Sequence, residues 1–268
     1  MAHIARGEFE EAYKVIRFTN PFPSACARVC HHPCEKSCRA GTTGGEPIAI
    51  RLLKRFVVDH VDPRVGSPQA EPAAADGARI AVIGAGPSGL TAAHFLSLMG
   101  HRVTVFEKEG KPGGMLMSAI PAYRLPRGLV RREMDSLINL NIEMRYNTAL
   151  GRDITIDDLF QKGYRAVYIA TGAHRSKRLG LPGEDAQGII PSMEFLKAHN
   201  LHKREMAKGR VGVVGGGNSA MDAARVALRQ QDVSSVIVLY RRTRSEMPAY
   251  PDEVEAGLLE GVELEAVS

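Results

Sequence analysis

All four cysteines of this 268-residue sequence lie in one short run and have the side chains to bind a metal. Cys26, Cys30, Cys34 and Cys38 are each separated by three residues, and no cysteine follows them. A secreted protein would spread its cysteines over several disulfide bridges, so the clustering predicts a metal or cluster site in a reducing compartment. Four thiolates suit an iron–sulfur cluster or a zinc ion. Zinc sites more often use pairs with two intervening residues, which favours iron–sulfur.

A glycine-rich turn forms the second candidate site. Gly84, Gly86 and Gly89 have G-x-G-x-x-G spacing between an apolar run and an Ala/Leu-rich segment. The first glycine of this pattern forms a tight turn, the second lets the backbone approach a pyrophosphate, and the third lets helix and strand pack closely. Glu107 ends the next apolar run, where a carboxylate can accept hydrogen bonds from a ribose. The order strand, turn, helix, strand and acid predicts a dinucleotide site.

A second glycine-rich turn lacks the acid. Gly215, Gly217 and Ala220 complete a G-x-G-x-x-A pattern, and Arg241 and Arg242 follow the next apolar run, where an NAD-binding acid is expected. Guanidinium groups suit a 2′-phosphate, which a carboxylate would repel. This corner therefore predicts NADPH as the nucleotide. The alternative is a solvated basic loop and the use of NADH.

The remaining sequence supplies the elements that must position these residues. Helical spacing of apolar residues predicts helices at 1–17 and 47–60, on either side of the cysteines, and at 128–140. The apolar run at 166–173 predicts a buried strand. A stretch rich in Pro, Ala and Gly at 63–78 indicates a linker.

Composition excludes several other classes of protein. A hydrophobic content of 44% and a charged content of 24% are ordinary for a globular protein. The net charge of +5 is too mild to indicate a nucleic-acid partner. Residues 1–12 fit no secretory signal, and the apolar stretch at 80–100 contains glycines and a proline that would break a membrane-spanning helix near its start. We therefore expect a cytoplasmic protein without a membrane span.

Two dinucleotide sites in one chain indicate two cofactors that exchange a hydride. The sequence resembles the NADPH-dependent glutamate synthase small-subunit family, to which the N-terminal half of dihydropyrimidine dehydrogenase is also similar. The motifs that carry the resemblance occur in family order over nearly the whole chain: NPFPSACARVCHHPCEKSC, PIAI, VIGAGPSGLTAA, FEKEGKPGGM, IPAYRLP, ATGA, LPGED, VVGGGNSAMDAAR, YRR and MPA.

The resemblance implies an α/β fold in which a helical iron–sulfur region precedes two Rossmann-like domains. The expected domains are a cysteine-rich region with a [4Fe-4S] cluster (1–62), a linker (63–78), a partial FAD domain (79–190) and a partial NAD(P)H domain (191–268). The implied FAD contacts are Gly84, Gly86, Pro87, Ser88, Gly89, Glu107, Gly114, Met115 and Arg124, with Thr171 and Gly172 beside them. The implied NADPH contacts are Gly215, Gly216, Gly217, Asn218, Ser219, Arg241 and Arg242. The implied cluster ligands are Cys26, Cys30, Cys34 and Cys38.

The sequence departs from the family pattern in three places. Related proteins have a further cysteine run that would precede Met1, so the number of clusters stays open. Cys26 lies where some relatives have no ligand, and Lys54 lies where some supply Gln or Glu. The returning FAD segment of the family would follow Ser268. We therefore expect a sequence truncated at both ends, with an incomplete FAD domain.

The expected mechanism is hydride transfer from the nicotinamide to FAD, followed by single-electron transfer to iron–sulfur and a redox partner. Candidate partners are ferredoxin and the glutamate synthase large subunit. No C-x-x-C pair follows the FAD motif, which argues against a disulfide reductase. We expect no catalytic acid or base side chain, because the cofactors supply the chemistry. The alternative function is a non-catalytic electron-transfer or docking subunit.

Overall fold

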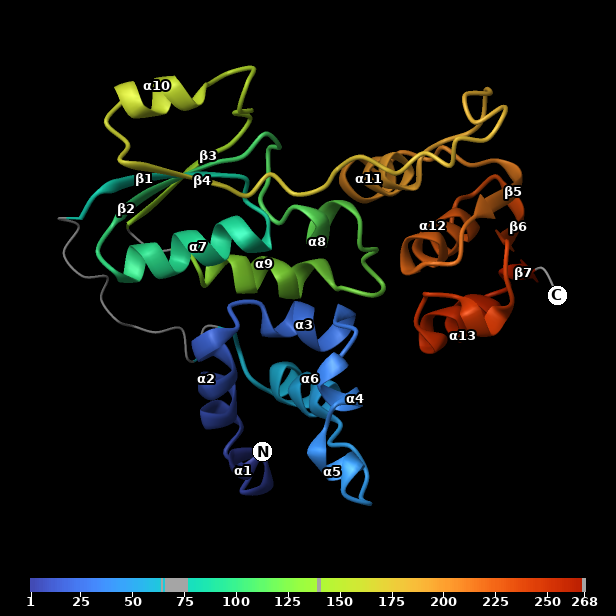
Figure 1. The fold of residues 1–268 in the computed structure, drawn as a ribbon, viewed down its shortest axis with the longest axis horizontal. Helices are drawn as coiled ribbons and strands as arrows, with labels where there is room; N and C mark the ends of the chain where they lie inside the picture. The colour runs from blue at the N-terminus through green and yellow to red at the C-terminus, as the bar shows by residue number, and fades with distance from the viewer. Residues whose placement is uncertain (64, 66–76, 139–140, 267–268) are drawn as a thin grey trace. The chain divides into compact units, whose positions relative to one another are not determined.

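The chain forms two compact units. The computed structural model describes residues 1–63, 65, 77–138 and 141–266, and Figure 1 shows its helices and strands. The first unit comprises Met1–Leu116 and Tyr123–Gly172, and the second comprises Met117–Ala122 and Ala173–Ser268. Each unit contains its own parallel sheet, so the expected α/β fold class is confirmed.

The first unit begins with a helical region that carries the cysteines. Its helices are α1 (Ala2–Ala5), α2 (Phe9–Thr19), α3 (Pro23–Val29), α4 (Pro33–Lys36), α5 (Arg39–Thr42) and α6 (Ile50–His60). The single helix predicted at 1–17 is interrupted, because Gly7 has a left-handed φ of 76°. Tyr13 of α2, Ala27 of α3 and Val57 of α6 are buried in one apolar cluster. This small core holds α3 against α2 and α6.

The same unit continues into a parallel sheet flanked by helices. Its elements are β1 (Arg79–Ile83), α7 (Pro87–Leu98), β2 (Arg102–Phe106), α8 (Met115–Ser118, which crosses the unit boundary), α9 (Arg127–Asp135), β3 (Ile142–Arg145), α10 (Ile156–Gln161) and β4 (Ala166–Ile169). The strand order is β3-β2-β1-β4, with all pairs parallel. Helices α7 and α9 cover one face and α10 the other (Figure 1). This is the order expected of a Rossmann-type half.

A buried carboxylate joins the helical region to the sheet region of this unit. Glu133 of α9 is fully buried, and its Oε1 accepts a hydrogen bond of 2.6 Å from the backbone N–H of Ser24 in α3. Burial raises the pKa of Glu133, although hydrogen bonds from Ser24 and Ala25 offset part of this effect. Arg17 of α2 donates to the Ser136 hydroxyl at 2.6 Å. The first turn of α3 is thus capped from a distant helix.

The second unit repeats the strand–helix–strand pattern. Its elements are α11 (Ser192–His202), β5 (Gly209–Val214), α12 (Asn218–Leu228), β6 (Val233–Tyr240), the 3₁₀ helix η1 (Arg244–Glu246), α13 (Pro251–Leu259) and β7 (Glu263–Ala266). Its sheet has the order β5-β6-β7, again parallel. Helix α12 is buried continuously from Ala220 to Ala227.

Some of the segments predicted from the sequence lie partly outside the residues that the structure describes. The predicted linker falls mostly on residues 64 and 66–76, which lie outside them, as do the last residues of the helix predicted at 128–140. Within the described part of that segment, α9 ends at Asp135. The predicted domain boundary at 190/191 stays a prediction. Among the helices described, none has the length and apolar character to cross a membrane.

Candidate dinucleotide and cysteine sites

The first glycine loop is shaped by contacts that only glycine permits. Gly84 has a φ of 106°, and an added Cβ would lie 2.4 Å from the Ala170 carbonyl oxygen at the end of β4. A Cβ on Gly89 would lie 1.9 Å from the Gly84 oxygen, so α7 starts in direct contact with the turn. A Cβ on Gly114 would lie 2.9 Å from the Gly86 Cα. The two glycine segments at 84–89 and 113–114 therefore form one narrow cradle.

The Glu107 carboxylate is hydrogen-bonded to the backbone of this cradle. Its side chain is buried, its Oε2 accepts from the Ala85 N–H at 2.7 Å, and its Oε1 accepts from the Glu109 N–H at 2.9 Å. Each carboxylate oxygen has two lone-pair positions, which leaves acceptor capacity for a ribose. The sequence indicated the ribose role but not the bond to Ala85, which also fixes the shape of the loop.

The cradle fits the phosphate group of a dinucleotide. The N-cap of α7 is Gly86, which has no side chain to satisfy the first N–H groups of that helix. Thr171 follows β4, and its Cα lies 3.5 Å from where a Gly84 Cβ would be. The structure therefore brings most of the predicted FAD residues to one edge of the sheet. Pro87 and Ser88 form the first turn of α7, Met115 and Arg124 are partly buried, and Thr171 and Gly172 are exposed.

The second glycine loop is more open. Gly215 has a φ of 137°, and its N–H donates to the Leu239 oxygen at 3.0 Å. A Cβ on Gly217 would meet no other described atom within 4 Å, whereas one on Gly216 would lie 2.5 Å from the Tyr240 ring. Gly217 is the N-cap of α12 and offers no side-chain cap. This turn at a helix N-terminus is of the kind that binds phosphate groups; its residues are Gly215, Gly216, Gly217, Asn218 and Ser219.

Two exposed arginines follow β6 beside this loop. Arg241 and Arg242 precede a short capping box in which Thr243 donates its N–H to Glu246 at 3.1 Å and its hydroxyl at 2.8 Å. These bonds lower the pKa of Glu246. The Tyr240 hydroxyl donates to the Glu246 backbone oxygen at 2.9 Å. Glu246, the nearest acidic residue in the sequence, is therefore held in a turn, and the basic side chains of Arg241 and Arg242 directly follow the end of β6.

The cysteines are distributed over three short helices. Cys26 is in α3, Cys30 is the C-cap of α3, Cys34 is in α4 and Cys38 is the N-cap of α5. The Cys30 and Cys38 Sγ atoms accept backbone N–H groups from His32 and Ile48, each at 3.4 Å. The Ile48 bond is the main cause that lowers the pKa of Cys38.

The donor set of these residues fits a [4Fe-4S] cluster, because four cysteine thiolates are the usual ligands of such a cluster and N–H···S bonds tune its reduction potential. In the part of the chain that the structure describes, no three His, Cys, Asp or Glu side chains are gathered closely enough to hold a metal ion. The assignment of Cys26, Cys30, Cys34 and Cys38 as ligands stays a prediction.

A pocket of about 610 Å³ lies between the cysteine region and the first glycine loop. Cys26 and Cys30 line it from α3, and Pro87 and Ser88 line it from the first turn of α7. Its remaining wall is mainly apolar and includes Tyr168, whose hydroxyl lies 3.0 Å from the Ser88 Oγ. Two thiols and a dinucleotide-type helix start thus share one pocket within one unit. No local sequence pattern could have shown this.

Two phosphate-type glycine loops and a cysteine-rich helical region define a nucleotide-dependent redox protein. Residues 78–267 match the model of the pyridine nucleotide-disulphide oxidoreductase family, and the chain belongs to this family. Residues 1–64 match the model described as dihydropyrimidine dehydrogenase domain II, 4Fe-4S cluster. These two family matches confirm the expected flavin, pyridine nucleotide and [4Fe-4S] cofactors. No cysteine occurs after Cys38, so the segment matched to the first model contains no redox disulfide.

Curated relatives agree with this assignment. The chain is 42% identical over 283 residues to the beta subunit of an NADP(+)-dependent formate dehydrogenase from Moorella thermoacetica, covering 97% of this chain and 40% of the relative. It is 40% identical over 262 residues to an NADPH-Fe(3+) oxidoreductase beta subunit from Geobacter sulfurreducens, covering 96% and 38%. It is 34% identical over 272 residues to the Escherichia coli glutamate synthase small chain, covering 96% and 57%.

The expected resemblance to the glutamate synthase small subunit is therefore confirmed. The chain spans about 40% of the length of the first two of these relatives. Among solved structures, Mycobacterium tuberculosis FprA in complex with NADPH superposes with a TM-score of 0.59 at 23% identity, over 66% of this chain and 46% of FprA. At that identity the likeness supports the fold alone.

Proposed function

We propose that this protein is a subunit of an NADPH-dependent oxidoreductase that passes electrons through FAD and iron–sulfur to a partner. The observation that carries the proposal is the shared pocket of the first unit. Cys26 and Cys30 line it opposite Pro87 and Ser88, at the start of the helix that would bind the flavin nucleotide. A short distance between a flavin and a cluster favours electron transfer, and the shared pocket lining supports the proposal in this respect.

In this proposal the two glycine loops have different ligands. The cradle at 84–89 with Glu107, Gly114, Met115, Arg124, Thr171 and Gly172 holds FAD, with the pyrophosphate at the start of α7. The loop at 215–219 holds the pyrophosphate of NADPH, and Arg241 and Arg242 bind its 2′-phosphate. When bound, FAD accepts a hydride and the cluster accepts electrons one at a time. The protein residues bind and orient, and none is assigned an acid or base role.

The partner is a redox protein or subunit. The names of the relatives describe subunits and a small chain of larger enzymes, which supports assembly with an electron acceptor. Ferredoxin and a glutamate synthase large subunit are the candidates. The clustering of all four cysteines between positions 26 and 38 supports a reducing compartment such as the cytoplasm as the location.

The proposal is tested by anaerobic purification of the full-length protein, followed by measurement of iron, acid-labile sulfide and FAD, and of NADPH oxidation with an artificial acceptor. We expect iron and sulfide in equal amounts and sustained oxidation. Zinc without sulfide would overturn the iron–sulfur assignment. Cofactors without NADPH oxidation would favour the alternative, a docking or electron-transfer subunit. Cys30→Ala, Cys34→Ala and Cys38→Ala should lower the iron content, and Cys26→Ala should lower it less.

A further inference from the structure

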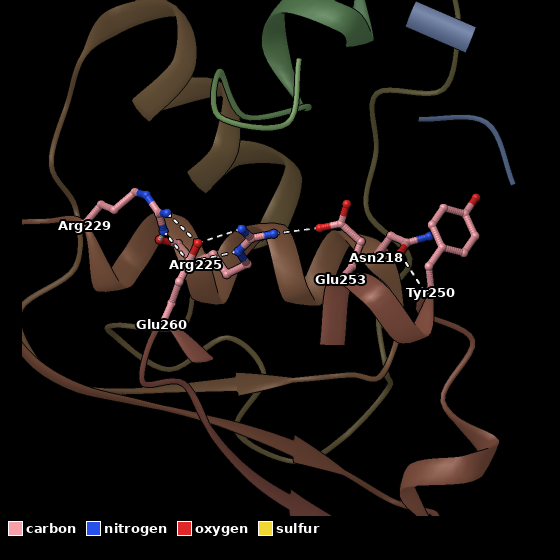
Figure 2. Close-up of polar contacts among 6 residues, drawn as sticks. All are labelled: Asn218, Arg225, Arg229, Tyr250, Glu253 and Glu260. Carbon is pink, nitrogen blue, oxygen red and sulfur yellow. Dashed lines mark hydrogen bonds and ion pairs between the residues drawn. The ribbon is translucent and has the colours of Figure 1, made fainter. Parts of the chain in front are cut away.

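A cluster of ion pairs around the buried side chain of Arg225 joins α12 to α13 in the second unit. We call Arg225, Arg229, Glu253 and Glu260 the arginine clamp (Figure 2). The Arg225 Nη1 lies 2.7 Å from the Glu253 Oε2, while its Nε and Nη2 lie 2.9 and 2.7 Å from the two oxygens of Glu260. Arg229 binds the same two oxygens at 2.7 and 2.8 Å. Arg225 is buried, so its ion pairs with Glu253 and Glu260 offset the cost of burying its charge.

The clamp holds α13 at both of its ends. Glu253 lies in the first turn of α13, and Glu260 is its C-cap. The two are two helical turns apart and therefore on one face. Arg225 and Arg229 hold the pKa of Glu260 at about 2, so the carboxylate is charged throughout the neutral range. Between these ends, a Cβ on Gly257 would lie 2.5 Å from the Met221 Cε, which shows how closely the two helices approach.

The segment that leads into α13 contacts the second glycine loop. The Ala249 N–H donates to the Gly216 oxygen at 3.0 Å. The Tyr250 N–H donates to the Asn218 Oδ1 at 3.0 Å (Figure 2). Tyr250 is the N-cap residue of α13. A displacement of α13 therefore moves the donors that hold Gly216 and Asn218 in place.

From these contacts we propose that Arg225, Glu253 and Glu260 are positioning residues for the pyrophosphate-binding loop. They fix α13, and through Ala249 and Tyr250 they hold the loop at 216–218 in the conformation that accepts a dinucleotide. This inference rests on the proposed function of that loop. It assigns to the clamp residues no contact with the nucleotide. Because the loop serves the part common to NADPH and NADH, the clamp affects both nucleotides equally.

The test uses Glu253→Gln and Glu260→Gln in the full-length, flavin-loaded protein. The matched control is Glu255→Gln, which makes the same change at an exposed position of α13. Dissociation constants for NADP+ and NAD+, and KM and kcat for NADPH, are measured below the melting temperature of each variant. We expect both dissociation constants and KM to rise roughly tenfold, as displaced binding groups do. We expect kcat, FAD content and the NADP+/NAD+ ratio to stay within about twofold, and the control to match the parent.

A purely structural clamp would lower the melting temperature without changing the dissociation constants of the folded protein, and that result would overturn the inference. If either Gln variant does not fold, Arg225→Lys decides, since it keeps the charge but loses the two-pronged geometry. A parent protein that binds NADP+ without oxidising NADPH would refute the proposed function, and the dissociation constants would still decide the clamp. A parent that binds neither nucleotide would refute both.

Discussion

The two glycine loops share a motif but are stabilised in different ways. At the third position the first loop has Gly89, where a Cβ would lie 1.9 Å from a backbone oxygen. The second has Ala220, whose Cβ lies 3.5 Å from where a Cβ on Gly215 would be, an ordinary contact. The choice between glycine and alanine thus reports how closely the helix approaches the turn. The third residue of the G-x-G-x-x-G pattern therefore indicates the distance between the helix and the turn.

The supports of the two loops also differ. Glu107, from the next strand of the same sheet, holds the first loop through the Ala85 N–H. The second loop is held by the segment before α13, through Gly216 and Asn218. A buried carboxylate thus supports the first loop, and the segment before a neighbouring helix supports the second. In the proposed assignment, the support of the first loop, Glu107, would also contact the ligand, whereas the support of the second loop would not, and the two arginines would contact its ligand instead.

The strongest test of this difference is Gly89→Ala. We expect a loss of about 3 kcal/mol or more in the free energy of unfolding, because the new methyl group would overlap the backbone of the turn. FAD content should fall with it. The matched control is Ala220→Gly, which should cost at most about 1 kcal/mol through helix propensity. Equal effects of the two changes, measured by thermal unfolding and FAD analysis, would show that the helix tolerates a methyl group equally well at both positions.

The second test concerns the basic corner. Arg241→Ala combined with Arg242→Ala should weaken NADPH binding at least roughly ten- to hundredfold, which is the effect of losing one charge-assisted bond of about 1.5–3 kcal/mol. NADH binding should be unchanged, because NADH has no 2′-phosphate. Titration of both nucleotides measures this. Parent protein that binds NADH as tightly as NADPH, or a double variant that loses both equally, would contradict the assignment.

The third test concerns Glu107. In Glu107→Gln, the single amide oxygen can accept from Ala85 or from Glu109 but not from both, since the amide nitrogen is a donor. One backbone N–H then loses its partner, which costs about 1–3 kcal/mol. FAD affinity should fall by roughly tenfold, whereas the NADP+ dissociation constant of the second loop should not change. A change in NADP+ binding alone would show that the two loops have been assigned to the wrong ligands.

The smallest effect is expected from pH at Glu260. Its folded-state pKa is about 2, against an ordinary value of 4.5. Its contribution to stability is therefore complete above about pH 5 and is lost as the pH falls from 4.5 towards 2. Glu260→Gln should be less stable than the parent by on the order of 1 kcal/mol near neutrality, and the gap should narrow in acid. Denaturation at several pH values measures it; a gap that widens in acid would contradict this sign.

Patterns within one element could be predicted from the sequence. The glycine spacings placed both turns, the apolar runs placed their flanking strands, and the position of Glu107 follows from the order of strand and acid. These features depend on neighbours in the chain. The break between α1 and α2 was missed, although Gly7 is a local signal for it.

Contacts between distant segments could not be predicted. Glu133 and Ser24 are 109 positions apart, and nothing in either segment identifies the other. The ion pairs of Arg225 with Glu253 and Glu260 likewise join two helices, 28 and 35 positions apart in the sequence, and were not predicted. The Tyr240 ring against Gly216 was missed for the same reason. The arrangement of the cysteines also depends on more than their spacing, because α3, α4 and α5 separate them.

The cap that Glu133 places on α3 has a consequence for hydrogen exchange. Both Ser24 and Glu133 are fully buried, so the Ser24 amide can exchange with solvent only when α3 and α9 separate. Separation would leave the Glu133 carboxylate and the Ser24 N–H without each other as partners, which makes a local opening costly. The cysteine helix and the flavin-type fold should therefore open together as one cooperative unit. Loss of the flavin nucleotide fold and loss of the thiol arrangement would then be the same event.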